Sequence, residues 1–403
     1  MSEESFFMHS RTPTLDDLDE NPCYHAWHAY LSEHGHGLDL SISNPTVVGL
    51  GTTEIDVETL YQAVCAPYCA SSQGLEMARK AISTDYYAGR VAADRLQLFA
   101  STSEAVGALL KLLCAPGDEV VTCTPTYPLL DCLTSLEAVR LNEVPFQDCA
   151  GEWEIDFYAL DRVCQARTRA VIVVSPNNPT GHIIRRDEMD KLVSFCAKRH
   201  MALIVDEVFG NYRFNEDSEH MPEAAAACFD SPGSGLIVSL SGLSKVCGLP
   251  QHKLGWAIFG GDPAVVDEAM QRMSFIADST LSVAGWIQRM MGQLLKNRTS
   301  FAESCLVRCR ENLAFLQEQS RCDNVKWRVD RVDGGWSACI RLPGWCNDEC
   351  IATRIAMNGV RVFPGSFFGF LDNQPTLVIS LIVQPDIMQK GFKIIADVLE
   401  ECL

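Results

Sequence analysis

The feature that most constrains the fold of this chain is a series of short apolar runs, separated from one another by helical patterns. The runs do not alternate apolar and polar residues, which is typical of strands buried on both faces of a sheet. Strands that alternate with helices form a mainly parallel sheet covered by helices. We therefore predict an α/β fold built on such a central sheet. The predicted strands cover residues 96–100, 119–123, 170–174, 202–205 and 236–240.

The pattern changes from about Met273 onward, where helices and strand-like pieces are mixed. A long helix is predicted over residues 276–293, and an extended segment surrounds Gly334-Gly335. We predict three parts: an N-terminal arm that contributes to the small domain, a large domain, and a smaller C-terminal α+β domain. Their predicted bounds are residues 1–45, 46–284 and 285–403.

Polar or aromatic side chains follow the predicted strands, close to the point where each strand ends. Ligands of parallel sheets bind beyond the carboxyl ends of the strands, so we expect these groups to meet at one edge. They are Ser101 to Ser103, Tyr127, Asn178, Asp206 and Lys245. The hydroxyls of the first group precede a predicted helix, whose free N–H groups would bind an anion. The same residues also suit a plain helix cap.

Lys245 follows the last of these strands and lies among small residues, after Ser241-Gly242-Leu243-Ser244. A lysine at the end of a buried strand is well placed to be desolvated, to lose its proton and to attack a carbonyl group. An ordinary surface lysine would fit this segment equally well if it stood alone. The other strand-end groups favour the nucleophile.

The 403-residue chain has a net charge of −19, which argues against nucleic acid or an anionic membrane as its main partner. No stretch approaches the roughly 20 apolar residues that span a bilayer. The acidic N-terminus lacks the features of a signal peptide, so we expect a cytoplasmic protein. The histidines between His25 and His36 have no acidic or thiol ligands at metal-binding spacing, so we predict no metal site.

The strand-end groups together suit one cofactor, pyridoxal 5'-phosphate. Lys245 would form a Schiff base with its aldehyde, and the helix start at Ser101 would bind its phosphate. Tyr127 would stack on the ring, and Asn178 would donate a hydrogen bond to the ring oxygen. Asp206 would keep the ring nitrogen protonated, which makes the ring an electron sink.

The chain resembles the class I and II aminotransferases, a family of fold-type I pyridoxal-phosphate enzymes, over nearly its whole length. Residues 175–181 (SPNNPTG) resemble the N-P-T-G signature of the family, and residues 206–209 (DEVF) resemble its D-E-x-Y element. Residues 125–128 (PTYP) resemble its P-x-Y-P stacking element. Residues 101–105 resemble its phosphate-binding turn, and residues 241–255 resemble its lysine segment. The matches occur in the family's order.

The resemblance implies that Lys245 holds the cofactor and then moves the substrate proton as a general base. Tyr68 resembles a tyrosine that reaches the phosphate of the neighbouring subunit, which implies a homodimer with shared active sites. The cofactor-binding residues implied in this way are Ser101, Thr102, Ser103, Tyr127, Asn178, Asp206, Phe209, Ser241, Gly242, Lys253 and Tyr68.

Three positions depart from the pattern of the family. Phe209 replaces a tyrosine that donates to the ring oxygen and lowers the Schiff-base pKa, unless Tyr212 takes over that role. Lys253 replaces a phosphate-binding arginine and lacks its two-pronged geometry. Val378 stands where the family has the arginine that holds the substrate carboxylate.

We take Ser43, Arg341 and Arg361 as candidate substrate-binding residues. The leading hypothesis is an aminotransferase that moves an amino group from an amino acid or amine to a 2-oxo acid in ping-pong order. One alternative is a lyase or decarboxylase that uses the same cofactor on the same fold. The other is a non-catalytic regulator that binds the cofactor.

Overall fold

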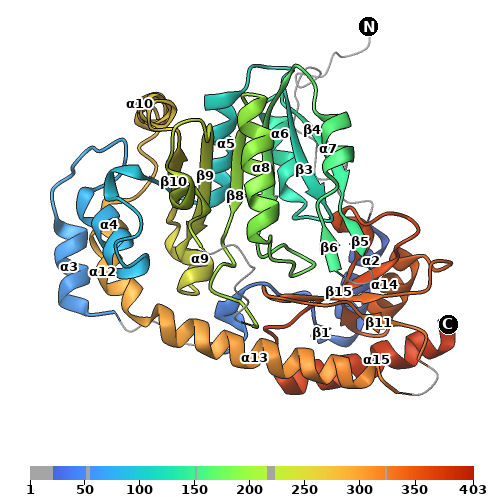
Figure 1. Ribbon diagram of the computed structural model, residues 1–403. Helices are drawn as coiled ribbons and strands as arrows, with labels where there is room; N and C mark the ends of the chain where they lie inside the picture. Colours follow the sequence, from blue (N-terminus) through green and yellow to red (C-terminus); the bar gives the residue numbers. More distant parts are fainter. Residues whose placement is uncertain (1–20, 51–54, 150–151, 216–222, 323–324) are drawn as a thin grey trace, which may run out of the picture.

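A seven-stranded sheet forms the centre of the computed structural model, which describes residues 21–50, 55–149, 152–215, 223–322 and 325–403. The strand order is β2-β10-β9-β8-β7-β3-β4, and only β10 runs antiparallel to its neighbours. The predicted α/β fold with a mainly parallel sheet is confirmed (Figure 1). The strands are β2 (Leu96–Phe99), β3 (Glu119–Thr124), β4 (Arg140–Pro145), β7 (Thr168–Val174), β8 (Ala202–Asp206), β9 (Leu236–Gly242) and β10 (Gly255–Gly261).

Both faces of this sheet are buried, as the unbroken apolar runs predict. Val171 and Leu203 face one core with helices α4, α7 and α8, whereas Ile172 and Ile204 face another core with α5, α6 and α10. Successive residues of a strand point to opposite faces, so each needs an apolar side chain. The helices are α4 (Glu76–Ala81), α5 (Thr102–Leu113), α6 (Leu129–Leu136), α7 (Phe157–Val163), α8 (Arg186–Lys198) and α10 (Pro263–Asp278).

A four-stranded antiparallel sheet of order β11-β12-β15-β14 lies beside the central sheet (Figure 1). Its strands are β11 (Arg328–Val329), β12 (Ser337–Arg341), β14 (Phe363–Pro364) and β15 (Thr376–Ser380). Its apolar core is shared with α13 (Arg298–Gln319), α14 (Asp348–Met357) and α15 (Pro385–Cys402). The predicted domain bounds at residues 45 and 284 remain predictions.

The N-terminal part of the described chain packs on this second region. Helix α2 (Pro22–His34) lies against α14, and β1 (Leu38–Asp39) pairs in parallel with β13 (Val360–Arg361). The remaining elements are α3 (Val57–Cys65), a π-helical turn (Ile82–Tyr86), the hairpin of β5 (Gln147–Cys149) and β6 (Glu152–Glu154), α9 (Leu243–Val246), α11 (Gly285–Arg289) and α12 (Met291–Leu294). Short 3₁₀ turns cover residues 45–47, 93–95, 225–229, 250–252, 295–297 and 365–368.

One predicted helix differs from the structure. The long helix over residues 276–293 is wrong, because Leu281 adopts a positive φ of 46° and separates α10 from the short helices α11 and α12. The apolar residues of this region are periodic because both short helices bury a face. Strand β1 ends at Asp39, whose carboxylate accepts a hydrogen bond from the backbone N–H of Ser41 at 2.8 Å.

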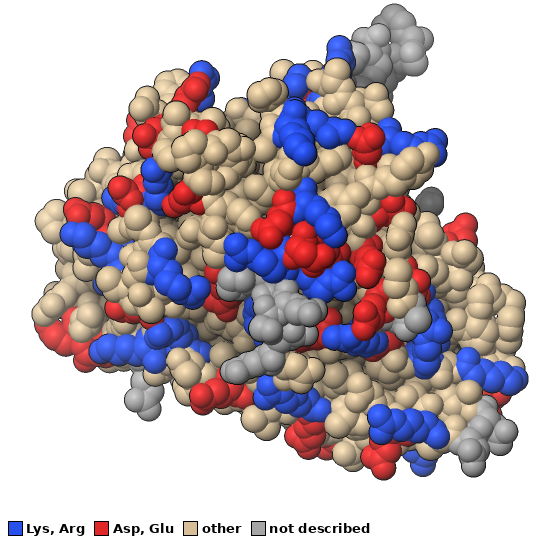
Figure 2. Space-filling view, in the orientation of Figure 1, with Lys and Arg blue, Asp and Glu red and all other residues tan. Residues whose placement is uncertain are grey.

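Acidic and basic side chains are interspersed over the face shown in Figure 2. Within the described residues, no helix combines the length and apolarity needed to cross a membrane. The same residues contain no group of three or more His, Cys, Asp or Glu side chains placed to hold a metal ion.

Candidate active site

Lys245 lies at the carboxyl end of β9, in the short helix α9. Its Nζ donates a hydrogen bond to the carbonyl oxygen of Ser43 at 2.9 Å. The same atom lies 4.7 Å from the ring centre of Trp336 and 5.4 Å from that of Phe209. The Tyr212 hydroxyl donates to the backbone carbonyl of Lys245, so it fixes the backbone of the lysine. The amine is therefore held against an aromatic wall at the edge of the sheet.

The surroundings of Lys245 favour its neutral form. Burial lowers the pKa of Lys245 from 10.5 to about 8, although the Asp206 carboxylate nearby opposes part of this shift. Burial raises the pKa of Asp206 to about 6, and the Val208 N–H and Lys245 oppose that shift. At neutral pH Asp206 is therefore mainly a carboxylate, and an appreciable fraction of Lys245 is an uncharged nucleophile.

The start of α5 has the features of an anion site. The Ser101 side chain accepts a hydrogen bond from the Glu104 N–H at 3.0 Å, and the Glu104 carboxylate accepts one from the Ala100 N–H at 2.5 Å. Thr102 and Ser103 form the first turn of this twelve-residue helix, where N–H groups lack helical partners. The predicted hydroxyl-bearing turn is thus also a helix cap, and the two roles are compatible.

Glycines bring β9 and β10 against this helix start. A Cβ on Gly255 would lie 3.0 Å from backbone atoms of both Ser101 and Thr102. A Cβ on Gly242 would lie 3.1 Å from the Cα of Gly255, its partner across the two strands. Because glycine has no side chain, β9, the strand that leads to Lys245, can lie next to the start of α5.

Tyr127 and Asn178 reach the same edge on two linked loops. The Asn177 side chain donates to the carbonyl oxygen of Pro125 at 3.2 Å and accepts from the Thr180 hydroxyl at 2.9 Å. Burial and the nearby charge of Asp206 raise the pKa of Tyr127, which remains 44% exposed. The stacking candidate and the amide candidate are therefore brought together with Asp206.

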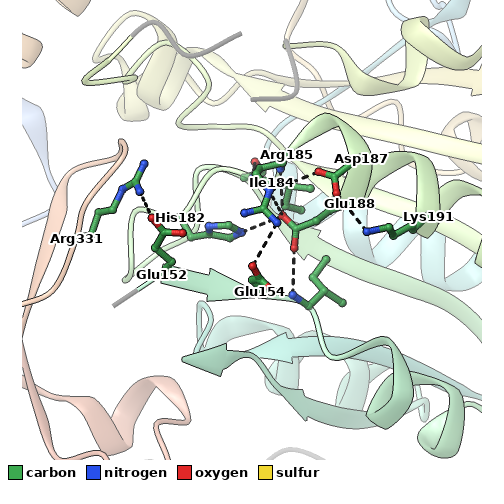
Figure 3. A network of polar contacts seen from close by, with 11 residues as sticks. Glu152, Glu154, His182, Ile184, Arg185, Asp187, Glu188, Lys191 and Arg331 are labelled. Atoms are coloured by element: carbon green, nitrogen blue, oxygen red, sulfur yellow. Dashed lines mark hydrogen bonds and ion pairs between the residues drawn. The ribbon is translucent and has the colours of Figure 1, made fainter. Parts of the chain in front are cut away.

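The end of the Asn178 loop is fixed by buried polar contacts, which Figure 3 shows. The buried Glu188 carboxylate accepts hydrogen bonds from the backbone N–H groups of Ile155 at 3.1 Å and Arg185 at 3.2 Å. The Nε2 of His182 lies 3.7 Å from the same carboxylate. Arg331 pairs with Glu152 and so connects the β5–β6 hairpin to the segment between β11 and β12 of the small sheet (Figure 3). These contacts hold the loop between the two sheets.

A cavity of about 510 Å³ opens between these loops and the small sheet. Cross-strand pairing aligns Phe363 with Val378 and Ser337 with Ser380. The small sheet lines the cavity with a polar part around Ser380 and an apolar part around Val378, on the same face of β15. The polar side chains include Ser41, Ser43, Tyr127, Asn178, Ser337 and Ser380, and the apolar ones include Phe363, Phe367, Phe368 and Val378.

The two candidate arginines do not line this cavity. Arg341 is buried, pairs with Asp330 at 2.7 Å, and borders a separate cavity of about 520 Å³. Arg361 pairs with Asp39 at 3.6 Å, and its guanidinium lies over the ring of Phe363, 5.5 Å from the ring centre. Ser43, in contrast, lies on the cavity wall and binds Lys245.

Three further residues predicted to bind the cofactor differ from one another in solvent exposure and position. Lys253 is exposed and adopts a positive φ of 48° at the end of a 3₁₀ turn. Tyr68 is 81% exposed and borders a third cavity, of about 320 Å³, which also contacts Glu104 at the start of α5. Ser241 is buried in β9 opposite Trp256. Their roles remain predictions.

Sequence reasoning missed Trp336 and the three phenylalanines of the cavity. The available signal was the two-residue period of β15, which places Val378 and Ser380 on one face. The Gly334-Gly335 turn was a second signal, because a Cβ on Gly334 would lie 2.3 Å from the carbonyl oxygen of Tyr212. This close approach brings Trp336 next to Lys245.

Comparison with known proteins places this geometry in a family. The family model "Aminotransferase class I and II" matches residues 67–374. An alanine aminotransferase of Mycobacterium tuberculosis is 28% identical over 265 residues, which cover 64% of this chain and 60% of that protein. A glutamate-pyruvate aminotransferase of Escherichia coli is 27% identical over 236 residues, or 57% of this chain and 56% of that protein. The chain thus matches less than two thirds of the length of these curated relatives.

Solved structures share the fold over nearly the whole chain. An alanine aminotransferase from Pyrococcus furiosus matches with a TM-score of 0.83 and 18% identity, covering 97% of this chain and all of the other. A Thermus thermophilus aspartate aminotransferase variant matches with a TM-score of 0.78 and 19% identity, covering 99% and 100%. The family match spans more than half of the chain and includes the lysine, aspartate and asparagine of the site. The chain therefore belongs to the class I and II aminotransferase family.

Proposed function

We propose that this protein is a pyridoxal-phosphate-dependent aminotransferase that moves an amino group from an amino acid or amine to a 2-oxo acid. The observation that carries the proposal is Lys245, a lysine with a lowered pKa at a strand end, electrostatically coupled to the partly buried Asp206. Coupled shifts of this kind in one cleft are typical of catalytic groups. The family supplies the class of reaction.

The residues present fit the proposed cofactor. Gly255 leaves space beside the start of α5, where its Cβ would press on the backbone of Ser101 and Thr102, and Gly242 lets β9 lie close to Gly255. N–H groups and hydroxyls at a helix start suit a phosphate, and Lys253 would add a positive charge. Tyr127 offers a ring face, Asn178 an amide donor and Asp206 a carboxylate for a protonated ring nitrogen. When bound, the cofactor supplies an aldehyde and an electron sink.

The chain's own groups have separable tasks in this proposal. Lys245 would hold the cofactor through its amine and, as a general base, would take a proton from the substrate carbon and return it. Tyr212 fixes the backbone of the lysine, and Trp336 and Phe209 exclude water from one side of the amine. The hydroxyl of Tyr212 is bound to the lysine backbone, which supports Asn178 as the donor to the ring oxygen.

We also propose a homodimer with shared active sites. Tyr68 carries this proposal, because its side chain is 81% exposed beside the cavity that contacts the start of α5. The neighbouring helix α3 exposes Val57, Tyr61 and Val64 as well. An exposed apolar surface of this kind is a candidate contact with a second copy. Sedimentation of the purified protein tests the proposal, and a monomer at micromolar concentration would contradict it.

A lyase or decarboxylase remains the second candidate, favoured by the absence of any lysine or arginine among the described residues that line the 510 Å³ cavity. A single-turnover experiment separates the candidates. Cofactor-loaded protein is mixed with a panel of amino acids and amines without an acceptor. Loss of the visible cofactor band with formation of pyridoxamine phosphate supports transamination. Release of ammonia or carbon dioxide with the band retained would support the second candidate instead.

A further inference from the structure

We propose that the 510 Å³ cavity beside Lys245 accepts substrates with an aromatic or other apolar side group and without an α-carboxylate. The inference rests on the proposed transamination and narrows it, from amino acids and 2-oxo acids to amines and the matching aldehydes or ketones. The amino group and two electrons pass from the donor amine to the acceptor carbonyl. The reaction therefore balances without an external oxidant.

The charges around the cavity oppose a carboxylate. Asp131 is the only charged side chain among the described residues that line it. Arg361, the basic group that lies over Phe363, is already paired with Asp39, and Arg341 is buried against Asp330 next to another cavity. A carboxylate taken into this cavity would lose its hydration and gain no cation from these walls.

Two of the hydroxyls that line the cavity, those of Ser41 and Ser380, already donate within the protein. The Ser41 hydroxyl donates to the Asp39 carboxylate at 2.6 Å, and the Ser380 hydroxyl donates to the carbonyl oxygen of Ile42 at 2.5 Å. Neither proton can serve an incoming anion without breaking its present bond. The carbonyl oxygen of Ser43 accepts a hydrogen bond from Lys245 and places the negative end of a dipole near the same hydroxyls. The part of the cavity around Ser41, Ser43 and Ser380 therefore presents acceptors, which suit an ammonium group better than a carboxylate.

The apolar part of the cavity suits an aromatic ring. Phe363 and Phe367 are stacked with ring centres 5.3 Å apart and an interplanar angle of 12°. Phe368 meets both edge-on, at 5.9 Å from Phe363 and 5.4 Å from Phe367. Val378 lies beside Phe363 across the strand pair. An added ring can continue such an arrangement by offset or edge-to-face contact.

The test compares matched substrates with the cofactor-loaded protein. In the first half-reaction, phenethylamine and phenylalanine differ only by the α-carboxylate. We expect kcat/KM for loss of the visible cofactor band to be at least tenfold higher with phenethylamine. Starting from the pyridoxamine-phosphate form, phenylacetaldehyde should be preferred over phenylpyruvate in the same way. Equal rates within threefold, or a preference for the carboxylates, would overturn the inference while leaving transamination intact.

A binding measurement tests the inference independently of turnover. Titration calorimetry compares 2-phenylethanol with 3-phenylpropionate, and the neutral ligand should bind at least tenfold more tightly. If no amine or amino acid changes the cofactor band, the proposed function fails, and the calorimetry still decides the character of the cavity. Tighter binding of 3-phenylpropionate would overturn the inference.

Val378→Arg provides the decisive variant, because this side chain would place a cation in the apolar part of the cavity. It should raise the ratio of phenylalanine to phenethylamine reactivity at least tenfold, whereas the uncharged control Val378→Met should change that ratio less than threefold. Thermal unfolding establishes that both variants are folded. A folded Val378→Arg protein with an unchanged ratio would contradict the proposal.

Discussion

Removal of the charge on Asp206 should make Lys245 more reactive in the cofactor-free protein, although it should abolish turnover in the loaded one. Burial lowers the pKa of Lys245 to about 8, and the Asp206 carboxylate is the main group that opposes this shift. Asp206→Asn keeps the shape of the side chain and removes its charge. The pKa of Lys245 should therefore fall below its value in the natural protein.

The magnitude follows from the two pKa values of the lysine. With a pKa of about 8 rather than 10.5, the neutral fraction of Lys245 at pH 7 is about a tenth rather than about 0.03%. Loss of a nearby opposite charge shifts a pKa by about one unit. Asp206→Asn should then leave about half of the amine neutral at pH 7, which gives roughly a fivefold faster reaction with an aldehyde.

The assay is reductive trapping of a small aldehyde on the cofactor-free protein, followed by mass spectrometry of the peptide that carries Lys245. The rate is measured against pH, with the exposed helix lysine Lys80 in the same digest as the internal control. The midpoint for Lys245 should lie near pH 8 and should fall in Asp206→Asn. A midpoint at pH 10 or above, or a rise in the variant, would refute the electrostatic reasoning.

Four further substitutions test the site and the buried charges around it. Phe209→Tyr should lower the pKa of the lysine–cofactor linkage, read as the pH dependence of its visible absorbance, because it adds a hydrogen-bond donor near the ring oxygen. Gly255→Ala should weaken cofactor affinity at least tenfold by equilibrium dialysis, since its Cβ would crowd the start of α5; unchanged affinity would argue against this phosphate site. Arg341→Met should lower the free energy of unfolding by about 3 kcal/mol in denaturant titrations, because it removes a partner of the buried Asp330, and should leave KM unaffected. Burial raises the pKa of Glu207 from 4.5 to about 8, so its contribution to stability is largest below pH 4.5 and is lost as pH rises to 8. The melting temperature of Glu207→Gln relative to the natural protein should therefore rise across that window, and a constant difference would count against the shift.

The central sheet and the meeting of the strand-end groups could be predicted because both follow from local patterns. An unbroken apolar run such as residues 170–174 must be buried on both faces, and parallel strands place their carboxyl ends at one edge. The positions of Lys245, Asp206 and Asn178 at this edge could be predicted from these two patterns alone. The edge strand β4 escaped prediction because only Val144 of its six residues is fully buried.

The substrate side of the site could not be predicted in the same way. The cavity wall depends on the register that aligns Phe363 with Val378 and Ser337 with Ser380, and this pairing joins residues far apart in the sequence. Arg341 is basic and close in sequence to Ser337, yet it lies at the other end of β12, where Asp330 neutralises it. Sequence alone shows which arginines exist, whereas their ion pairs decide which are available.

The most direct test of the central claim is the identity of the residue that carries the cofactor. The purified protein is loaded with pyridoxal 5'-phosphate, reduced with borohydride and digested, and the modified peptide is sequenced by mass spectrometry. The account predicts a phosphopyridoxyl group on Lys245, and loss of the visible band and of amine-dependent bleaching in Lys245→Ala. Modification of another lysine, or a Lys245→Ala variant that retains the band with cofactor alone, would contradict it.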